Sequence, residues 1–201
     1  MEFHFDAQKI VGQEAAKRAL EIALTGRHHL ILVGPPGMGK SALIKSFDEI
    51  IKPLRPDRIN LVKETRPCPC GYYGDSLKEC ICTARQITLF QHPWINFVSM
   101  RVEVPRVAFV KLEKGYEGEP SELIFKRIKK ALKFREDRKQ ETAIPKDGMA
   151  LLKRAVDSLG LCPKDFFSTI KVARTIADLD FSENVMIAHV AEAIQYRLFK
   201  T

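Results

Sequence analysis

The chain has 201 residues, of which 45% are hydrophobic and 29% are charged, and this composition is typical of a globular protein rather than of a disordered one. Its length allows one or two domains. Lys and Arg number 33 against 25 Asp and Glu, and the net charge of +8 favours polyanionic partners such as nucleotide or nucleic acid without establishing one.

Neither a membrane span nor a secretory signal is expected. No apolar run reaches the roughly 18 residues that a transmembrane helix needs. The first ten residues include Glu2, Asp6 and Lys9, whose charges are unlike the apolar stretch of a secretory signal. We therefore expect a cytoplasmic protein with no membrane partner, whose five cysteines stay reduced.

The first part of the chain predicts alternating helices and strands. Apolar residues at helical spacing indicate helices, continuous apolar runs indicate buried strands, and glycine and proline mark the turns. In chain order we expect a helix over 14–25 capped by Asp6, a buried strand over 30–33, a glycine-rich loop over 34–41, a helix over 42–51, a strand over 59–63, a cysteine-rich insertion over 67–82, a helix over 83–90 and a strand over 100–110.

The rest of the chain predicts a helical unit. Glycines and a proline in residues 114–120 place a boundary between a domain over 1–118 and a domain over 119–201. Four helices are expected beyond it, over 121–139, 149–159, 163–179 and 184–196, the last capped by Ser182. The first of these helices has a basic face that would suit DNA phosphates, although interleaved acidic residues favour a solvated surface.

Residues 34–41 match the phosphate-binding pattern G-x-x-x-x-G-K-[ST] at every fixed position, between an expected strand and an expected helix. Glycines let successive N–H groups turn onto phosphate oxygens, and the following helix adds its dipole. Lys40 would reach the β- and γ-phosphates, and the Ser41 hydroxyl would ligate Mg²⁺. A nucleoside triphosphate such as ATP is the expected ligand; the alternative is a glycine-rich turn that binds nothing. The expected nucleotide-binding residues here are Gly34, Pro35, Pro36, Gly37, Met38, Gly39, Lys40 and Ser41.

Four cysteines form two close pairs. One residue separates Cys68 from Cys70, and one residue separates Cys80 from Cys82. Four thiolates can hold Zn²⁺ in a closed tetrahedral site, although the usual spacing within a pair is C-x₂₋₄-C. Two interpretations stay open: a zinc site, or a loop of reduced cysteines kept for packing. Cys162 lies alone and is expected to be a small buried apolar residue.

Further stretches carry a resemblance to a known family. They are residues 11–20, the cysteine-rich residues 67–72 with Cys80 and Cys82, and residues 102–107, 172–179 and 191–197. Together with the phosphate loop they resemble the magnesium-chelatase-like AAA+ ATPases, and most closely the ComM-type competence and recombination proteins. These stretches cover most of the chain, and their combination is far more specific than the phosphate loop alone.

The resemblance implies a P-loop NTPase of the AAA+ type, with an α/β core, a reduced parallel sheet and a C-terminal helical lid. In that family such modules assemble into rings and couple ATP turnover to work on a partner, which for the ComM type is helicase-like branch migration on DNA. The resemblance also implies nucleotide-binding residues outside the loop. These are Val11 and Gly12 before the first helix, and Lys164 and Arg174 in the lid, where Lys164 replaces an arginine.

The chain departs from the family in the residues of hydrolysis. The family's core has an apolar strand ending in Asp-Glu, whose acids hold Mg²⁺ and polarise the attacking water. No stretch of this chain matches it: Asp48-Glu49 lies on the helix after the loop, and Glu64 stands alone at the end of an interrupted apolar run. Arg66 occupies the place of a sensor asparagine, and Phe97 the place of the arginine that reaches a neighbouring subunit's nucleotide.

We therefore expect an ATP-binding AAA+ module with its middle removed, weak or no hydrolysis, and no catalytic residue that can be named. Two alternatives stay open: an active AAA+ ATPase that remodels DNA in recombination, and a zinc-dependent nucleic-acid-binding module that keeps a phosphate loop. The expected cofactors are ATP and Mg²⁺, with Zn²⁺ if the cysteines bind metal. The expected partners are nucleotide, DNA and a homo- or hetero-oligomeric ring.

Overall fold

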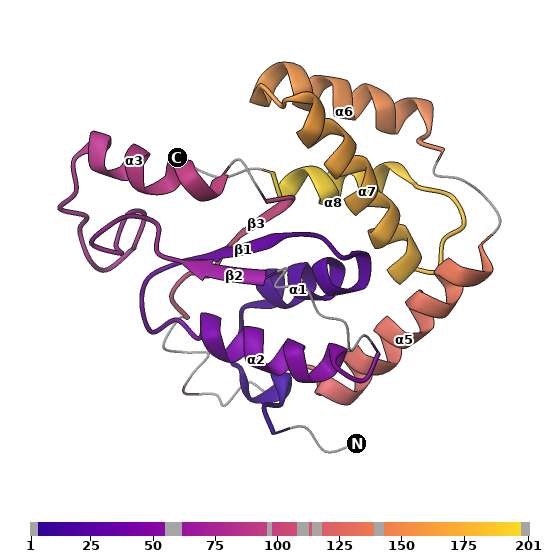
Figure 1. Cartoon of the computed structure of the whole chain (residues 1–201), viewed down its shortest axis with the longest axis horizontal. Helices are drawn as coiled ribbons and strands as arrows, with labels where there is room; N and C mark the ends of the chain where they lie inside the picture. Colours follow the sequence, from indigo (N-terminus) through magenta and orange to yellow (C-terminus); the bar gives the residue numbers. More distant parts are fainter. Residues whose placement is uncertain are drawn as a thin grey trace.

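A computed structural model describes residues 4–54, 62–95, 98–107, 113, 118–138 and 143–197, without the side chains of 91–95. In these residues a small parallel sheet is surrounded by helices (Figure 1). This mixed α/β architecture confirms the expected fold class, a P-loop core with a reduced parallel sheet and a helical C-terminal part. Across the described ranges, no helix has both the length and the apolar character needed to cross a membrane.

Three strands form the described part of the sheet. β1 (Leu30–Val33) lies in the middle, between β2 (Val62–Thr65) and β3 (Met100–Glu103). Both pairings are parallel, and Leu32 of β1 lies opposite Glu64 of β2. Because parallel strands end at the same edge of a sheet, the residues that follow all three strands meet there. This edge carries the candidate site.

The helices of the first half build the core around the sheet. A short 3₁₀ helix, η1 (Ala7–Lys9), precedes α1 (Glu14–Gly26). The helix α2 (Lys40–Ile51) follows the glycine-rich loop, and α3 (Ala84–Ile95) follows the cysteine-rich loop. α1 contacts β1, β3 and α2, so it supports the sheet on one face.

Four helices make up the second half of the structure. They are α5 (Ser121–Asp137), α6 (Lys146–Leu159), α7 (Pro163–Leu179) and α8 (Ile187–Gln195). α7 is the central member, since it contacts α1, α5 and α8, while α6 packs on α8. The helical unit is attached to the core through α1, which contacts α5 and α7, and through α2, which contacts α5.

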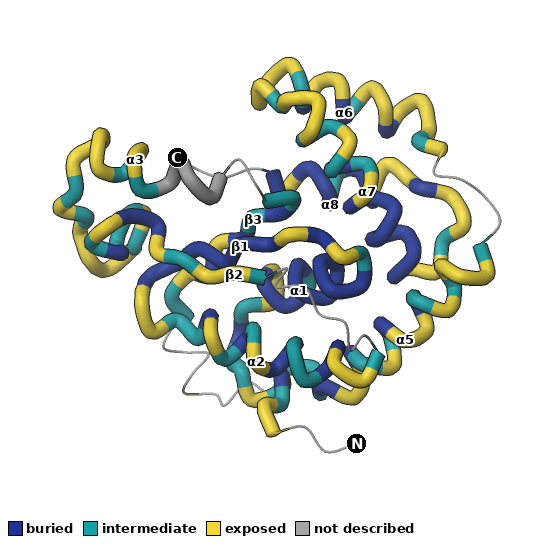
Figure 2. Tube along the Cα trace, viewed as in Figure 1, coloured by how far each residue is buried: buried dark blue, intermediate teal, exposed yellow. Residues whose placement is uncertain are grey.

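One hydrophobic cluster extends through both halves of the chain. It includes Leu20 and Ile22 of α1, Ile128 of α5 and Ile176 of α7, each of which is fully buried. Figure 2 shows this buried interior running from the sheet and α1 into α7 and α8, while α6 and α3 expose much of their surface. The division of the chain at residue 118 stays a prediction, and residues on both sides of it share this core.

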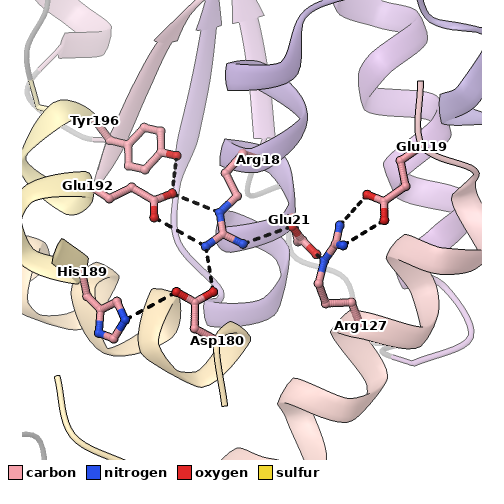
Figure 3. Close-up of polar contacts among 8 residues, drawn as sticks. All are labelled: Arg18, Glu21, Glu119, Arg127, Asp180, His189, Glu192 and Tyr196. Carbon is pink, nitrogen blue, oxygen red and sulfur yellow. Dashed lines mark hydrogen bonds and ion pairs between the residues drawn. The ribbon is translucent and has the colours of Figure 1, made fainter. Parts of the chain in front are cut away.

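Charged side chains add a second connection between the halves (Figure 3). Arg18 of α1 donates to Glu192 of α8 with an Nε–Oε1 distance of 3.0 Å, and it pairs with Asp180 after α7 at 3.3 Å. On α1 it also pairs with the buried Glu21, which accepts in turn from Arg127 of α5. Three helices of the second half thus converge on one face of α1.

The strands differ from their expected bounds. β2 was expected over 59–63, but it covers Val62–Thr65, and residues 59–61 lie outside the described residues. β3 was expected to reach residue 110, but it ends at Glu103, with residues 108–110 outside the described ranges. Pro105 has no N–H to continue a ladder, which accounts for the early end.

Capping accounts for the differences at three helices. Asp6 was expected to cap the helix that begins near residue 14, but its carboxylate accepts from the backbone N–H of Gln8 and caps η1 instead. α8 begins after Met186 rather than after Ser182, whose hydroxyl donates to the carbonyl of Asn184 at 2.7 Å. α6 begins at Lys146, directly after its N-cap Pro145 and earlier than the expected residue 149.

Candidate functional site

The glycine-rich loop between β1 and α2 has the conformation that its sequence demands. Gly37 and Gly39 have φ angles of +80° and +81°, in the left-handed region that glycine tolerates best. Gly34 is required for a different reason: a Cβ there would lie 2.2 Å from the carbonyl oxygen of Val104. Gly39 is also the N-cap of α2, so the loop leads directly into the helix N-terminus, where backbone N–H groups can bind an anion.

Lys40 is held inside this loop. Its ammonium group donates to the carbonyl oxygens of Gly34 at 2.8 Å and Pro35 at 2.7 Å, and its side chain is buried. Burial lowers the pKa of Lys40 below its usual value, the nearby charge of Glu64 opposes this, and the charge of Arg66 adds to it. The loop therefore surrounds a cation, as expected of a site for phosphate.

Ser41 contacts an acidic residue that was not expected to take part in the site. Its hydroxyl donates to Oε1 of Glu64 at 2.8 Å. The parallel register explains the contact, because Glu64 lies opposite Leu32, close to the end of β1 from which the loop departs. The sequence contains one indication of this contact, a carboxylate near the end of a short strand. Lys63 beside it interrupts the apolar run by which a buried strand is recognised.

The cysteine-rich loop lies at the same edge of the sheet (Figure 1). A Cβ on Gly71 would lie 3.0 Å from Pro36, so the two loops approach closely. Asp75 of the cysteine-rich loop forms an ion pair with Arg106 at 2.7 Å. These two residues line a cavity of about 540 Å³ together with Gly34 and Pro35.

The four paired cysteines converge on one point. The Sγ atom of Cys68 lies 3.3 Å from that of Cys70 and 3.7 Å from that of Cys80, and the Sγ atoms of Cys70 and Cys80 are 3.6 Å apart. The Sγ of Cys82 belongs to the same group, in which all four sulfur atoms lie within 4.8 Å of one another. A tetrahedral zinc site with Zn–S bonds of about 2.3 Å would separate its sulfurs by about 3.8 Å. The arrangement could hold a metal ion.

One thiol of this group favours its metal-binding form. A backbone hydrogen bond from Tyr72 is the main cause that lowers the pKa of Cys70 to about 6. In Cys80 and Cys82 a backbone hydrogen bond acts in the same direction, but desolvation and the hydrogen bonds with Cys70 and Cys68 outweigh it and raise the pKa. The thiolate is the form of cysteine that ligates metals. The fifth cysteine, Cys162, is exposed, so the expectation that it would be buried was wrong.

The predicted nucleotide contacts in the lid lie away from the loop. Lys164 and Arg174 line a pocket of about 640 Å³ with Arg27 and His28, which precede β1, whereas the phosphate loop follows it. Arg174 is engaged locally: it donates to Asp178 at 3.1 Å and to the carbonyl of Glu183 at 2.6 Å. Within one chain the structure does not bring these two residues to the phosphate loop.

The other residues that the family resemblance singled out lie in different parts of the chain. Val11 and Gly12 precede Gln13, which donates to the carbonyl of Pro105, one of the residues that line the cavity beside the phosphate loop. Arg66 donates to the carbonyl of Pro69 at 3.3 Å, within the cysteine-rich loop. Phe97 lies outside the described residues.

Several basic residues of α5 and its C-cap form ion pairs within the chain. Lys126 pairs with Glu122 at 2.8 Å, and Arg138 pairs with the buried Asp178 at 2.5 Å. Arg127 contacts Glu21, as described above. These ion pairs favour the interpretation of the basic face of α5 as a solvated and structural surface.

Comparison with known proteins identifies the family of the chain. The family model described as "Magnesium chelatase, subunit ChlI" matches residues 6–59 and 55–112, and the model described as "Magnesium chelatase, subunit ChlI C-terminal" matches residues 118–197. The chain is 21% identical over 304 residues to the competence protein ComM of Haemophilus influenzae and, over the same length, to the uncharacterized protein YifB of Salmonella typhimurium. Each comparison covers 96% of this chain and 60% of the relative.

A third relative matches a shorter stretch of this chain at higher identity. The uncharacterized protein Rv2897c of Mycobacterium tuberculosis is 43% identical over 49 residues, which are 24% of this chain and 10% of that protein. The chain spans 60% of the length of ComM and YifB, and the matched stretch of 304 residues is longer than this chain of 201. The matched stretch of these relatives therefore includes residues that have no counterpart in this chain. The chain belongs to the magnesium chelatase ChlI family and, within it, is similar to the ComM-type proteins.

Proposed function

We propose that this chain binds a nucleoside triphosphate, with ATP as the expected ligand, at the loop of residues 34–41, and that it hydrolyses the nucleotide slowly or not at all. The observation that carries the proposal is the position of Lys40, whose ammonium group is held by two loop carbonyls at the N-terminus of α2. Family membership supports nucleotide and Mg²⁺ as ligands.

The acidic residues of the described strands support weak hydrolysis. They are Glu64 in β2 and Glu103 at the end of β3, and neither belongs to an Asp-Glu pair. An enzyme of this type needs one group to hold Mg²⁺ and another to orient the attacking water. A chain without the second group still binds the nucleotide but loses most of its rate of hydrolysis.

ATP binding and turnover measured on one purified sample test this function. We expect saturable ATP binding that Lys40→Ala weakens by at least about tenfold, because the ammonium is the charge that meets the phosphates. We expect phosphate release slower than roughly 1 per second, the lower end of typical enzyme rates. Faster release would favour the active ATPase, and an unchanged affinity in Lys40→Ala would contradict the proposed site.

A metal site at Cys68, Cys70, Cys80 and Cys82 is a second proposal, supported by the sulfur separations. Zinc there would stabilise the loop that borders the nucleotide cavity. Elemental analysis of protein purified without a metal-affinity step should give about one zinc per chain, and Cys80→Ser should remove most of it. Cys162→Ser is the matched control, since that thiol is exposed and outside the cluster. Less than one zinc per several chains would leave the alternative of reduced cysteines.

The partners of the whole protein follow from the family alone. We propose that the chain associates with copies of itself or with full-length relatives in a ring, and that any partner beyond the nucleotide is DNA. The division into a core over 1–118 and a helical lid over 119–201 belongs to the same proposal. Size measurement with and without ATP would test the ring, because AAA+ assembly places nucleotide between subunits.

A further inference from the structure

Strand β2 occupies the position directly beside the phosphate-loop strand. Glu64 lies opposite Leu32, one residue before the end of β1, and the next pair is Val33 with Thr65. Successive side chains of a strand point to opposite faces, so Glu64 and its neighbour Thr65 point different ways. The carboxylate is therefore presented close to the edge of the sheet where the loop begins.

The Glu64 carboxylate contacts the side chain that the phosphate-loop pattern assigns to Mg²⁺. Ser41 is the second residue of α2, and its hydroxyl donates to Oε1 of Glu64 at 2.8 Å. The charge of Glu64 also acts on the buried ammonium of Lys40, the adjacent residue. Acid, hydroxyl and ammonium thus form one polar group at the start of α2.

This pair of oxygens fits the requirements of Mg²⁺. The ion takes oxygen ligands in a near-ideal octahedron at 2.0–2.1 Å, so neighbouring ligand oxygens are separated by about 2.9 Å. Carboxylate and hydroxyl are both suitable donors, and Mg²⁺ is usually bound by one or two carboxylates together with phosphate oxygens and water. The observed 2.8 Å between Ser41 and Glu64 is close to that separation.

We propose that Glu64 is a Mg²⁺-binding residue of the nucleotide site, acting with Ser41 in place of the acid on the strand that this chain lacks. The proposal rests on the proposed function, since it concerns the metal that accompanies the nucleotide. If so, the chain keeps one carboxylate that can bind the ion. The next residue, where an acid that orients the attacking water would be needed, is Thr65. Mg²⁺ should then strengthen nucleotide binding without supporting rapid turnover.

The test compares ATP affinity in Mg²⁺ with ATP affinity in EDTA for the full chain, for Glu64→Gln and for Glu122→Gln. Glu122 is the matched control because its carboxylate is exposed and pairs with Lys126 on α5. Wild type and Glu122→Gln should bind ATP about tenfold or more tightly with Mg²⁺, and Glu64→Gln should lose most of this enhancement while its affinity in EDTA stays at or above that of wild type. Glu64→Asp, which keeps the charge, should restore part of the enhancement.

The outcomes separate this inference from the proposed function. If Glu64→Gln keeps the wild-type enhancement, or if wild type binds ATP equally with Mg²⁺ and with EDTA, Glu64 does not bind the ion and nucleotide binding stands without it. If wild type binds no ATP under either condition, the proposed function fails and the inference fails with it. A circular dichroism spectrum of each variant establishes that Glu64→Gln and Glu64→Asp are folded.

Discussion

At the scale of single residues, the site depends on backbone positions that only glycine occupies easily. A Cβ on Gly39 would meet no atom within 4 Å, so the requirement comes from its φ of +81° and not from lack of space. A left-handed conformation costs an ordinary residue about 1–2 kcal/mol. Any substitution there either strains the loop or changes the direction of the N–H groups that follow it.

We expect Gly39→Ala to lower the free energy of unfolding by about 1–2 kcal/mol and to weaken ATP binding as well. Gly160 offers a matched control, because it has a φ of +62° and open space around its Cβ position, but it lies at the end of α6. Gly160→Ala should cost similar stability and leave the affinity unchanged. Denaturant titration and ATP titration of both variants check this, and equal effects on affinity would contradict a local role for Gly39.

The buried His28 leads us to predict that the stability of the fold depends on pH. Burial, helped by the charges of Arg135 and Lys171, lowers its pKa from 6.5 to about 4. Between these two values the unfolded chain binds a proton at this residue and the folded chain does not. Stability therefore falls as the pH drops through that range, by up to about 3 kcal/mol from this group.

Urea titrations between pH 7 and pH 4 measure this dependence. His28→Gln should lose less stability than wild type over the range, because the variant has no imidazole to protonate at this position. His4→Gln is the control, since His4 is exposed near the N-terminus and is not among the groups that act on His28, so this variant should keep the wild-type slope. An unchanged slope in His28→Gln would show that other groups determine the acid sensitivity.

At the scale of elements, short contacts decide where the helices attach. The Asp6 carboxylate accepts from the backbone N–H of Gln8 at 3.0 Å and from that of Ser121, the first residue of α5, at 2.9 Å. The Ser121 hydroxyl accepts in return from the backbone N–H of Ala7 at 2.8 Å. One side chain therefore caps two helices that are far apart in the sequence.

Asp6→Ala should lower the free energy of unfolding by about 1–2 kcal/mol, the range for loss of a helix cap, because two backbone donors lose their acceptor. Asp6→Asn should cost less, since the amide oxygen can still accept. Thermal or urea unfolding of both variants measures the difference. An equal loss in the two variants would indicate that the charge of Asp6 matters more than its hydrogen bonds.

The elements also show how far the sequence could predict the fold and the site. The phosphate loop, β1 and α2 were predictable because strand, glycine motif and helix agree locally. The bounds of α8 and the role of Asp6 were not, because Met186 and Ser121 act as partners only in the folded chain. Glu64 was missed for the same reason: its contact with Ser41 arises from strand pairing, which single-strand composition does not reveal.

At the scale of the whole molecule, the described part of the sheet has three strands, and β2 is directly adjacent to β1. The first family model matches in two segments that overlap at residues 55–59, as expected of a chain that lacks a central part of the family's sequence. With so small a sheet, stability depends more on helix contacts across residue 118. The ionic contacts of α1 with α5, α7 and α8 accompany the shared hydrophobic core there.

Because the two halves share these contacts, we expect the chain to unfold in one cooperative step. We also expect Glu21 of α1 and Arg127 of α5 to be energetically coupled. Glu21 is buried, with 4% of its side chain exposed, and it contacts Arg127 and Arg18. A double-mutant cycle with Glu21→Gln and Arg127→Met should give a coupling energy of about 1–3 kcal/mol, as for contacting residues of one network. The exposed pair Glu122 and Lys126 on α5 should give a much smaller coupling energy, since solvent screens it. Equal coupling in the two pairs, or two separate unfolding transitions in wild type, would mean that the helical unit is stable without its contacts to α1.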